Sequence, residues 1–276
     1  MITTIVSIIV LSTIGIASAM PTVVDTNSTA EAFNVLAFWA TTGDEAHTSF
    51  YNEANRWFPQ QASAHGFTYR STSNWDELTA ENLKKYQVLL FLDDVPYSDS
   101  QHRVLQHYLE SGAGGLIAFH ASMYNDADPG YTFQWFYNTL FGAGRYVSNT
   151  WWPTKAKLHV DSPNHPAMKG LPQKFDACVN EWYRWQHDLR QNKDIEILAS
   201  IDPSSFPLGT DPSQTWHSGY YPVIWANKHH RAIYMNVGHN LMDYGKHQTK
   251  SSTFASEEQN KFLFQAMHWA AGRAVL

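Results

Sequence analysis

The sequence predicts an α/β fold in which one mostly parallel sheet lies between two layers of helices. Short apolar runs, typical of strands buried on both faces, recur along the first half of the 276-residue chain. Amphipathic segments with helical spacing separate these runs, and such alternation produces βαβ units. The chain shows no internal repeat and no low-complexity tract.

The expected elements follow one another from residue 33 onwards. Strands are predicted at 33–40, 67–71, 87–92 and 116–119, and helices at 48–64, 78–85 and 98–111. His65-Gly66 ends the first helix and the glycines at 112, 114 and 115 end the third, as helix C-termini favour. The second half is less regular, with a helix at 131–141 and strands at 156–160, 196–201, 222–226 and 231–237. A helix at 256–272 completes a doubly wound, flavodoxin-like three-layer αβα sandwich, predicted as one domain over 33–272.

The first 32 residues precede this domain. An apolar run from Ile5 to Ile16 is followed by Ala17-Ser18-Ala19, which has the small-x-small form of a signal-peptidase site. We expect a signal peptide over 1–19, a flexible leader over 20–32, and a secreted or extracytoplasmic protein. A retained membrane anchor is the alternative, but the run is shorter than the roughly 20 residues that span a bilayer. No second run of that length follows, so no membrane association is expected after cleavage.

Composition and charge narrow the classes of ligand. The formal net charge of −6 and the lack of a basic run argue against nucleic acid as a partner. Cys178 is the only cysteine, so no disulfide forms within the chain. The 11 Trp, 14 Tyr and 15 Phe suit either a pocket that stacks on sugars or an aromatic core. The sequence lacks the phosphate-binding, dinucleotide-binding, nucleophile-elbow and His-Glu-x-x-His motifs, so no nucleotide cofactor is expected.

Histidines follow three of the predicted strands. His47, His120 and His239 belong to loops at the carboxyl ends of strands, where open α/β sheets bind their ligands. Glu181 is flanked by aromatic residues, and a carboxylate in apolar surroundings has a raised pKa that suits acid–base chemistry. A surface ion pair with Arg184 is the alternative for this acid. Three imidazoles and a carboxylate also suit zinc or another divalent metal.

Other polar residues receive structural interpretations. Asp93-Asp94 follows the strand at 87–92 and suits a carboxylate pair, but a helix N-cap or a loop turn is the favoured interpretation. The remaining candidate histidines are interpreted as surface or capping residues: His65, His102, His107, His229 and His230.

Several segments, taken in order, resemble the trehalose-utilisation, ThuA-like family. The longest is Gly114-Gly115-Leu116-Ile117-Ala118-Phe119-His120-Ala121-Ser122, which is similar to the family's Gly-Gly-x-x-x-x-His-Ala-Ala/Ser. The others are Asn164-His165-Pro166, Gly170-Leu171-Pro172, Asn180-Glu181-Trp182-Tyr183, Pro222-Val223-Ile224-Trp225 and Gly238-His239. Thr42-Gly43 with His47-Thr48-Ser49 resembles Gly-x-x-His-x-Ser with two extra residues, so His47 carries the least weight and His120 the most.

The resemblance implies a fold similar to class I glutamine amidotransferases, with His120 at the elbow where those enzymes carry a nucleophilic cysteine. Cys178 does not follow a strand and cannot take that role, so glutamine amidotransferase chemistry is not expected. The family is associated with uptake or breakdown of disaccharides, including keto-sugar derivatives.

We therefore expect a secreted enzyme, a hydrolase or a lyase, that acts on a small-molecule carbohydrate. In this hypothesis His120 and Glu181 are proton donor and acceptor, and His47 and His239 orient the substrate or hold a metal. Trp182 and Tyr183 would stack on a sugar ring. A non-catalytic carbohydrate-binding protein is the main alternative, and a structural domain with a vestigial site is the third.

Overall fold

A computed structural model describes residues 32–275 apart from 42, 128–130, 151 and 206–218. The expected signal peptide at 1–19 and all but the last residue of the expected leader at 20–32 lie outside the described residues. None of the described helices is both long and apolar enough to cross a membrane.

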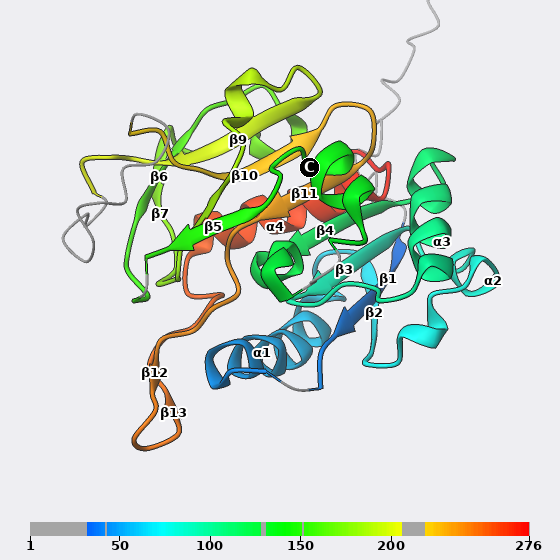
Figure 1. The fold of residues 1–276 in the computed structure, drawn as a ribbon, viewed down its shortest axis with the longest axis horizontal. Coiled ribbons are helices and arrows are strands. Elements are labelled where there is room, and N and C mark those ends of the chain that lie inside the picture. Colours follow the sequence, from blue (N-terminus) through cyan, green and yellow to red (C-terminus); the bar gives the residue numbers. More distant parts are fainter. Residues whose placement is uncertain (1–31, 42, 128–130, 151, 206–218, 276) are drawn as a thin grey trace, which may run out of the picture.

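A large sheet forms the centre of the fold (Figure 1). Among the described residues it contains nine strands, in the order β2-β1-β3-β4-β11-β10-β9-β6-β7. Their bounds in that order are Phe67–Thr72, Phe33–Trp39, Val88–Leu92, Gly115–Phe119, Ala232–Met235, Pro222–Asn227, Ile195–Ile201, Lys157–Val160 and Lys174–Asp176. The neighbours from β2 to β11 pair in parallel, and those from β11 to β7 pair antiparallel. The predicted α/β sandwich is confirmed.

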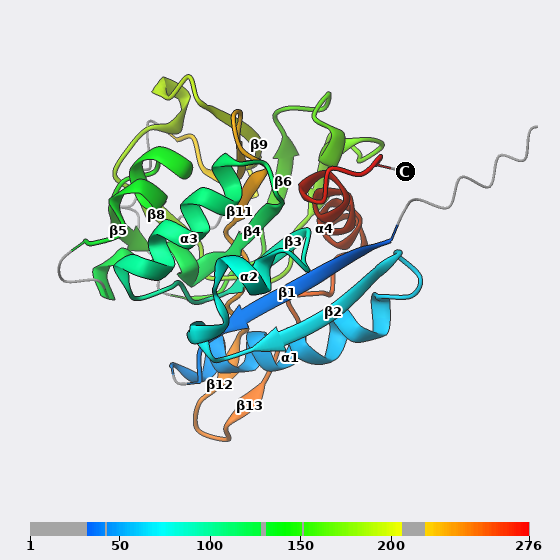
Figure 2. The ribbon, with the colours of Figure 1, turned by 90° about the vertical axis from the view of Figure 1, so that its right-hand side faces the viewer.

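Helices cover both faces of the sheet (Figure 2). On one face lie α1 (Glu45–Gln61) and α4 (Glu257–Ala270). On the other lie α2 (Ala80–Leu83), α3 (Asp99–Glu110) and a π-helix at Trp135–Leu140. Successive residues of β1 alternate between the two cores, Val35 toward α1 and Leu36 toward α3. This alternation explains the continuous apolar runs, because both faces of each strand are buried.

Side-chain caps fix where the main helices begin. Asp44 accepts a hydrogen bond from the backbone N–H of Ala46 at the start of α1. Ser98 and Gln101 form a capping box at the start of α3, and Ser256 caps α4. These caps satisfy N–H groups that have no partner within the helix.

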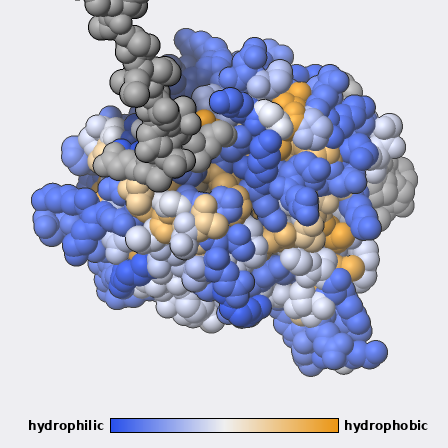
Figure 3. Space-filling model, turned by 180° about the vertical axis from the view of Figure 1, so that it is seen from behind, coloured by the Kyte–Doolittle hydropathy of each residue, from blue (hydrophilic) through white to orange (hydrophobic). Residues whose placement is uncertain are grey.

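The sequence did not predict the shortest elements. A small separate sheet pairs β5 (Tyr146–Asn149) with β8 (Tyr183–Trp185), and a hairpin pairs β12 (Met242–Asp243) with β13 (Gln248–Thr249). Short 3-10 turns occur at Trp75–Glu77, His120–Met123, Asn125–Ala127, Pro166–Met168 and Leu189–Gln191. The hairpin projects from the body beside α1 and is the hydrophilic lobe at the lower right of Figure 3. Strands of two or three residues are too short to show an apolar period, and none of the four residues of β5 is buried.

Much of the aromatic surplus fills the two cores. The largest fully buried side chains include Trp182, Trp225, Tyr137 and Tyr234. The interpretation of the aromatic residues as core residues therefore holds for most of them.

Candidate active site

The carboxyl ends of four parallel strands meet at one edge of the sheet. His47 follows β1, Asp93 follows β3, His120 follows β4 and His239 follows β11. The chain runs from β1 to β2 on one side and returns to β3 on the other, so β1 and β3 are neighbours. Such a switch point leaves a crevice at the carboxyl ends, which is where open α/β sheets bind ligands.

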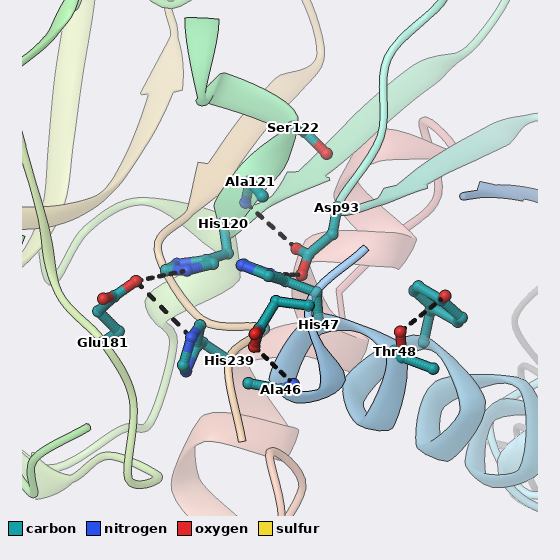
Figure 4. Close-up of polar contacts among 12 residues, drawn as sticks. Ala46, His47, Thr48, Asp93, His120, Ala121, Ser122, Glu181 and His239 are labelled. Atoms are coloured by element: carbon teal, nitrogen blue, oxygen red, sulfur yellow. Dashed lines mark hydrogen bonds and ion pairs between the residues drawn. The ribbon is translucent and has the colours of Figure 1, made fainter. Parts of the chain in front are cut away.

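His47 and Asp93 form a hydrogen-bonded pair across this switch point (Figure 4). The distance from His47 Nδ1 to Asp93 Oδ2 is 2.7 Å, and the Asp93 side chain is only 1% exposed. Asp93 has a φ of 58°, and its Oδ1 accepts a hydrogen bond of 3.2 Å from the backbone N–H of Ala121. Asp93 does occupy a loop turn, as expected, but its carboxylate also contacts the residues of the site. Asp94 points elsewhere and accepts hydrogen bonds from Trp75 and Tyr97, so the two acids do not form a pair.

His120 occupies a strained elbow directly after β4. Its φ is 30°, and its side chain is completely buried. Asn236 donates its amide N–H to the carbonyl of Tyr183 at 3.2 Å, which turns its Oδ1 toward His120 Nδ1 at 2.9 Å. Because an amide oxygen only accepts, His120 must carry its proton on Nδ1. Its Nε2 has no hydrogen-bond partner and lies 3.9 Å from Glu181 Oε2.

A glycine allows the loop after β11 to approach these residues. Gly238 has a φ of 147°, and a Cβ there would lie 2.7 Å from Asp93 Oδ1 and 3.0 Å from His120 Cβ. Any larger residue would push the loop away from the sheet edge. His239, the next residue, therefore reaches the same crevice, and its ring centre lies 4.8 Å from that of His47.

Asn180 places Glu181 opposite the histidines. Its Oδ1 accepts hydrogen bonds of 3.0 Å from the backbone N–H groups of Gly238 and His239, and its amide donates to the carbonyl of Asn236 at 2.7 Å. This buried side chain joins the segment before β8 to the loop after β11. Glu181 Oε2 consequently lies 3.7 Å from His239 Nε2, so the acid faces the histidines (Figure 4). The alternative of a surface ion pair with Arg184 does not fit this placement.

Burial and charge give the ionisable groups different proton affinities. Burial raises the pKa of Glu181 to about 7, against the opposing charge of His47. Burial also raises the pKa of Asp93 to about 6, although its hydrogen bond with His47 opposes the rise. Burial lowers the pKa of His47, but the hydrogen bond and charge of Asp93 prevail and raise it above its usual value. Burial and the neighbouring His47 lower the pKa of His239 to about 3 and hold that of His120 well below its usual range.

Three of these groups, His47, Glu181 and His239, belong to the wall of a pocket of about 350 Å³, a size that suits a small ligand. It is lined by Asp44, His47, Tyr124, Asn149, Trp152, Pro153, Glu181, Tyr183, His239, Leu241, Met242 and Tyr244. A larger hollow of about 740 Å³ near the start of α4 is lined by other residues, including Lys157 and Cys178. The chemistry of the smaller pocket, rather than volume, makes it the candidate site.

The pocket changes the expected weight of the histidines. His47 lines it with a side chain that is 20% exposed, whereas His120 is fully buried behind Glu181 and His239. The sequence ranked these two the other way round, because the loop before His47 is longer than the motif that it resembles. The start of α1 compensates for that length by placing His47 in its first turn.

The two aromatic residues expected to stack on a sugar differ in position. Tyr183 lines the pocket, and its ring centre lies 3.9 Å from that of His120. Trp182 is fully buried in the core, where its indole N–H donates to the carbonyl of Thr154 at 3.2 Å. The stacking role proposed for Trp182 is wrong because its side chain is completely buried and does not line the pocket. The aromatic side chains at the pocket mouth are Tyr124, Trp152 and Tyr244, which the sequence did not single out.

The other candidate residues lie outside the pocket. Cys178 is buried against α4, and its backbone N–H donates to Gln259. The five histidines interpreted as surface or capping residues do not line the pocket either. That interpretation is wrong for His102, which is buried and bonded through Nε2 to the carbonyl of Pro96 at 2.9 Å.

The residues that suggested a metal site lie close together in the structure. They are His47, His120, His239 and Glu181, which share one crevice. Within the part of the chain that the structure describes, however, no group of three or more His, Cys, Asp or Glu is arranged to hold a metal ion.

Comparison with known proteins identifies the family. The family model described as "Trehalose utilisation", ThuA, matches residues 34–270. The chain belongs to the ThuA family. A ThuA-like protein of Bacteroides uniformis has a similar structure, with a TM-score of 0.73 and 31% sequence identity over 88% of this chain and 93% of that one.

A second ThuA-like structure, from Parabacteroides merdae, has a TM-score of 0.60 and 16% identity, with 87% of this chain and 90% of that one covered. At that identity the likeness shows the fold alone. No curated protein matches the chain. One fold hosts many chemistries, so the residues of the site itself determine the function of this ThuA family member.

Proposed function

We propose that this ThuA family protein is an enzyme that binds a carbohydrate in the pocket of about 350 Å³ and cleaves a bond in it by acid–base chemistry. The observation that carries this proposal is a carboxyl group, Glu181, whose pKa of about 7 lets it hold a proton at neutral pH while it faces His47 and His239. Groups with such values give and take protons efficiently under physiological conditions.

The two groups with complementary roles are Glu181 and His47. In our mechanism His47 Nε2 removes a proton from a water molecule or from the substrate, and the charge of Asp93 stabilises the imidazolium that results. Glu181 gives its proton to the oxygen that leaves. Hydrolysis and elimination use the same two transfers and differ only in the atom that His47 deprotonates. His239, neutral at physiological pH because its pKa is about 3, offers a hydrogen-bonding side chain to a hydroxyl group.

The walls of the pocket favour a sugar as the ligand. Among the described residues the exposed large hydrophobic side chains are Tyr97, Tyr124, Val147, Trp152 and Tyr244, and three of these five line this one pocket. Flat apolar surfaces above a polar floor match a sugar ring, which presents C–H groups on its faces and hydroxyls around its edge. The family description, trehalose utilisation, agrees with this class of substrate.

The proposal is tested by incubating the purified protein with a panel of disaccharides and their keto derivatives and detecting products by mass spectrometry. Wild-type protein should turn over at least one compound, and Glu181→Gln should reduce kcat by about 100-fold or more while binding persists. Binding without turnover would favour the carbohydrate-binding alternative, and absence of both would refute the proposal.

We also propose that the protein is exported. N-terminal sequencing of the secreted protein should then give a sequence that begins at Met20.

A further inference from the structure

Two histidines of the site form a hydrogen bond through the same ring nitrogen, Nδ1, but to different partners. Each uses Nδ1 to bond an oxygen that is held in place by the backbone. For His47 this oxygen belongs to the carboxylate of Asp93, at 2.7 Å, and for His120 it belongs to the amide of Asn236, at 2.9 Å. The side chains of Asp93 and Asn236, which supply these oxygens, are almost completely buried.

The two partners have different effects on a protonated imidazole. A buried carboxylate attracts the positive charge of an imidazolium, whereas an amide oxygen accepts the same hydrogen bond without a compensating charge. The amide of Asn236 cannot simply rotate, because its nitrogen already donates to the carbonyl of Tyr183 at 3.2 Å. A rotated amide would place its N–H group against the N–H of His120.

The surroundings reinforce the difference. His47 interacts with three carboxyl groups, Asp93 after β3, Asp44 at the start of α1 and Glu181 before β8, and its side chain also reaches the pocket. These acids offset its contacts with the other two imidazoles, His120 and His239, whose ring centres are 5.3 and 4.8 Å away.

His120 has fewer compensating groups. It is fully buried, its ring packs on that of Tyr183 at 3.9 Å, and the rings of His47 and His239 lie 5.3 and 5.6 Å away. Glu181 is the acid that faces it, with Oε2 3.9 Å from His120 Nε2. A second positive charge at this position would be close to that of His47 and far from water.

We propose that Asp93 and Asn236 are positioning residues that assign different tasks to the two histidines. Asp93 makes His47 the histidine that gains and loses a proton, while Asn236 keeps His120 neutral with its Nε2 lone pair directed toward Glu181. His120 then accepts a hydrogen bond from the protonated Glu181 carboxyl after a small movement, and holds that proton ready for transfer. The catalytic part rests on the proposed function, whereas the protonation states do not.

Histidine-selective ¹⁵N NMR tests the protonation states without any substrate, because the nitrogen shifts distinguish the two neutral tautomers from the imidazolium. Resonances are assigned with single His→Gln variants. In the wild-type protein, His120 should remain the neutral Nδ1–H form from about pH 5 to 8, while His47 titrates above the usual histidine midpoint near 6.5. A wild-type His120 that titrates in this range, or that carries its proton on Nε2, would overturn the inference.

Two substitutions that exchange the carboxylate and the amide then test whether these partners set the protonation states of the two histidines. Asp93→Asn should lower the titration midpoint of His47 by about 1–3 pH units, and Asn236→Asp should raise that of His120 into the measured range. Asp194→Asn is the matched control, because Asp194 bonds the exposed His229 at 2.9 Å far from the pocket. It should change the His229 signal alone.

The outcomes separate this inference from the proposed function. An unchanged His47 midpoint in folded Asp93→Asn protein, as judged by circular dichroism, refutes the positioning role even if carbohydrate is turned over. The expected spectra without turnover of any carbohydrate leave the positioning roles intact and refute the acid–base function instead. If either exchange prevents folding, the wild-type spectra still decide the tautomers and charge states.

Discussion

Replacement of Glu181 by glutamine should make the protein more stable at alkaline pH. Glu181 is 9% exposed, and burial raises its pKa from the usual 4.5 to about 7. Between these values the native state binds more protons than the unfolded state, so wild-type stability falls as the pH rises through this window. At about 1.4 kcal/mol for each pKa unit, the ionised carboxylate destabilises the native state by roughly 3 kcal/mol above pH 7.

The Glu181→Gln variant lacks this ionisation. Its free energy of unfolding, measured by urea denaturation at several pH values, should differ from wild type by a constant amount below about pH 4.5 and then gain roughly 3 kcal/mol by pH 8. Glu77→Gln is the control, because Glu77 pairs with Arg70 at 2.6 Å and has a lowered pKa. Its effect should be destabilising and should stay constant from pH 6 to 8. A pH-independent difference for Glu181→Gln would refute the argument that this acid is held at a raised pKa.

Four further substitutions test the packing and capping of the fold. Trp182→Ala should lower the free energy of unfolding by about 3–5 kcal/mol, because Trp182 is fully buried. Trp152 is 58% exposed, so Trp152→Ala should leave the thermal midpoint unchanged. The same variant should weaken sugar binding measured by calorimetry. The opposite pattern would restore Trp182 as a ligand contact. Gly115→Ala should lower the free energy of unfolding by about 3 kcal/mol, because the new Cβ would lie 2.5 Å from the backbone oxygens of Ala270 and Arg231. Thermal unfolding measures this change, and an unchanged stability would contradict the close packing. Ser98→Ala removes the capping box of α3 and should cost about 1 kcal/mol in urea denaturation, with equal stability arguing against the cap.

The order of the main helices and strands could be predicted well, because each element is marked by a pattern among residues that are neighbours in the sequence. The run from Phe33 to Ala40 is apolar at nearly every position, and the structure buries it between two helical layers. The predicted helices at 98–111 and 256–272 begin at the N-cap residues of α3 and α4, which are Ser98 and Ser256. The π-helix at Trp135–Leu140 was predicted as an ordinary helix over 131–141, because its apolar spacing does not reveal the wider turn.

The site was predicted in part. The sequence indicated His47, His120, His239 and Glu181, and these residues meet in one crevice. It undervalued Asp93, whose importance depends on a φ of 58° and on a partner 46 positions away. It missed Asn180 and Asn236, because a buried asparagine has no characteristic pattern in a sequence.

The sequence by itself determined the fold class and the side of the sheet at which polar residues gather, because apolar period and helix caps are properties of neighbouring residues. The tertiary structure alone decided which histidine lines the pocket and which is buried behind it. That decision depends on strand order, which places β1 beside β3, and on hydrogen bonds such as that between His120 and Asn236, which are 116 residues apart. Such contacts form only when distant loops are brought to the same edge of the sheet, so no local pattern encodes them.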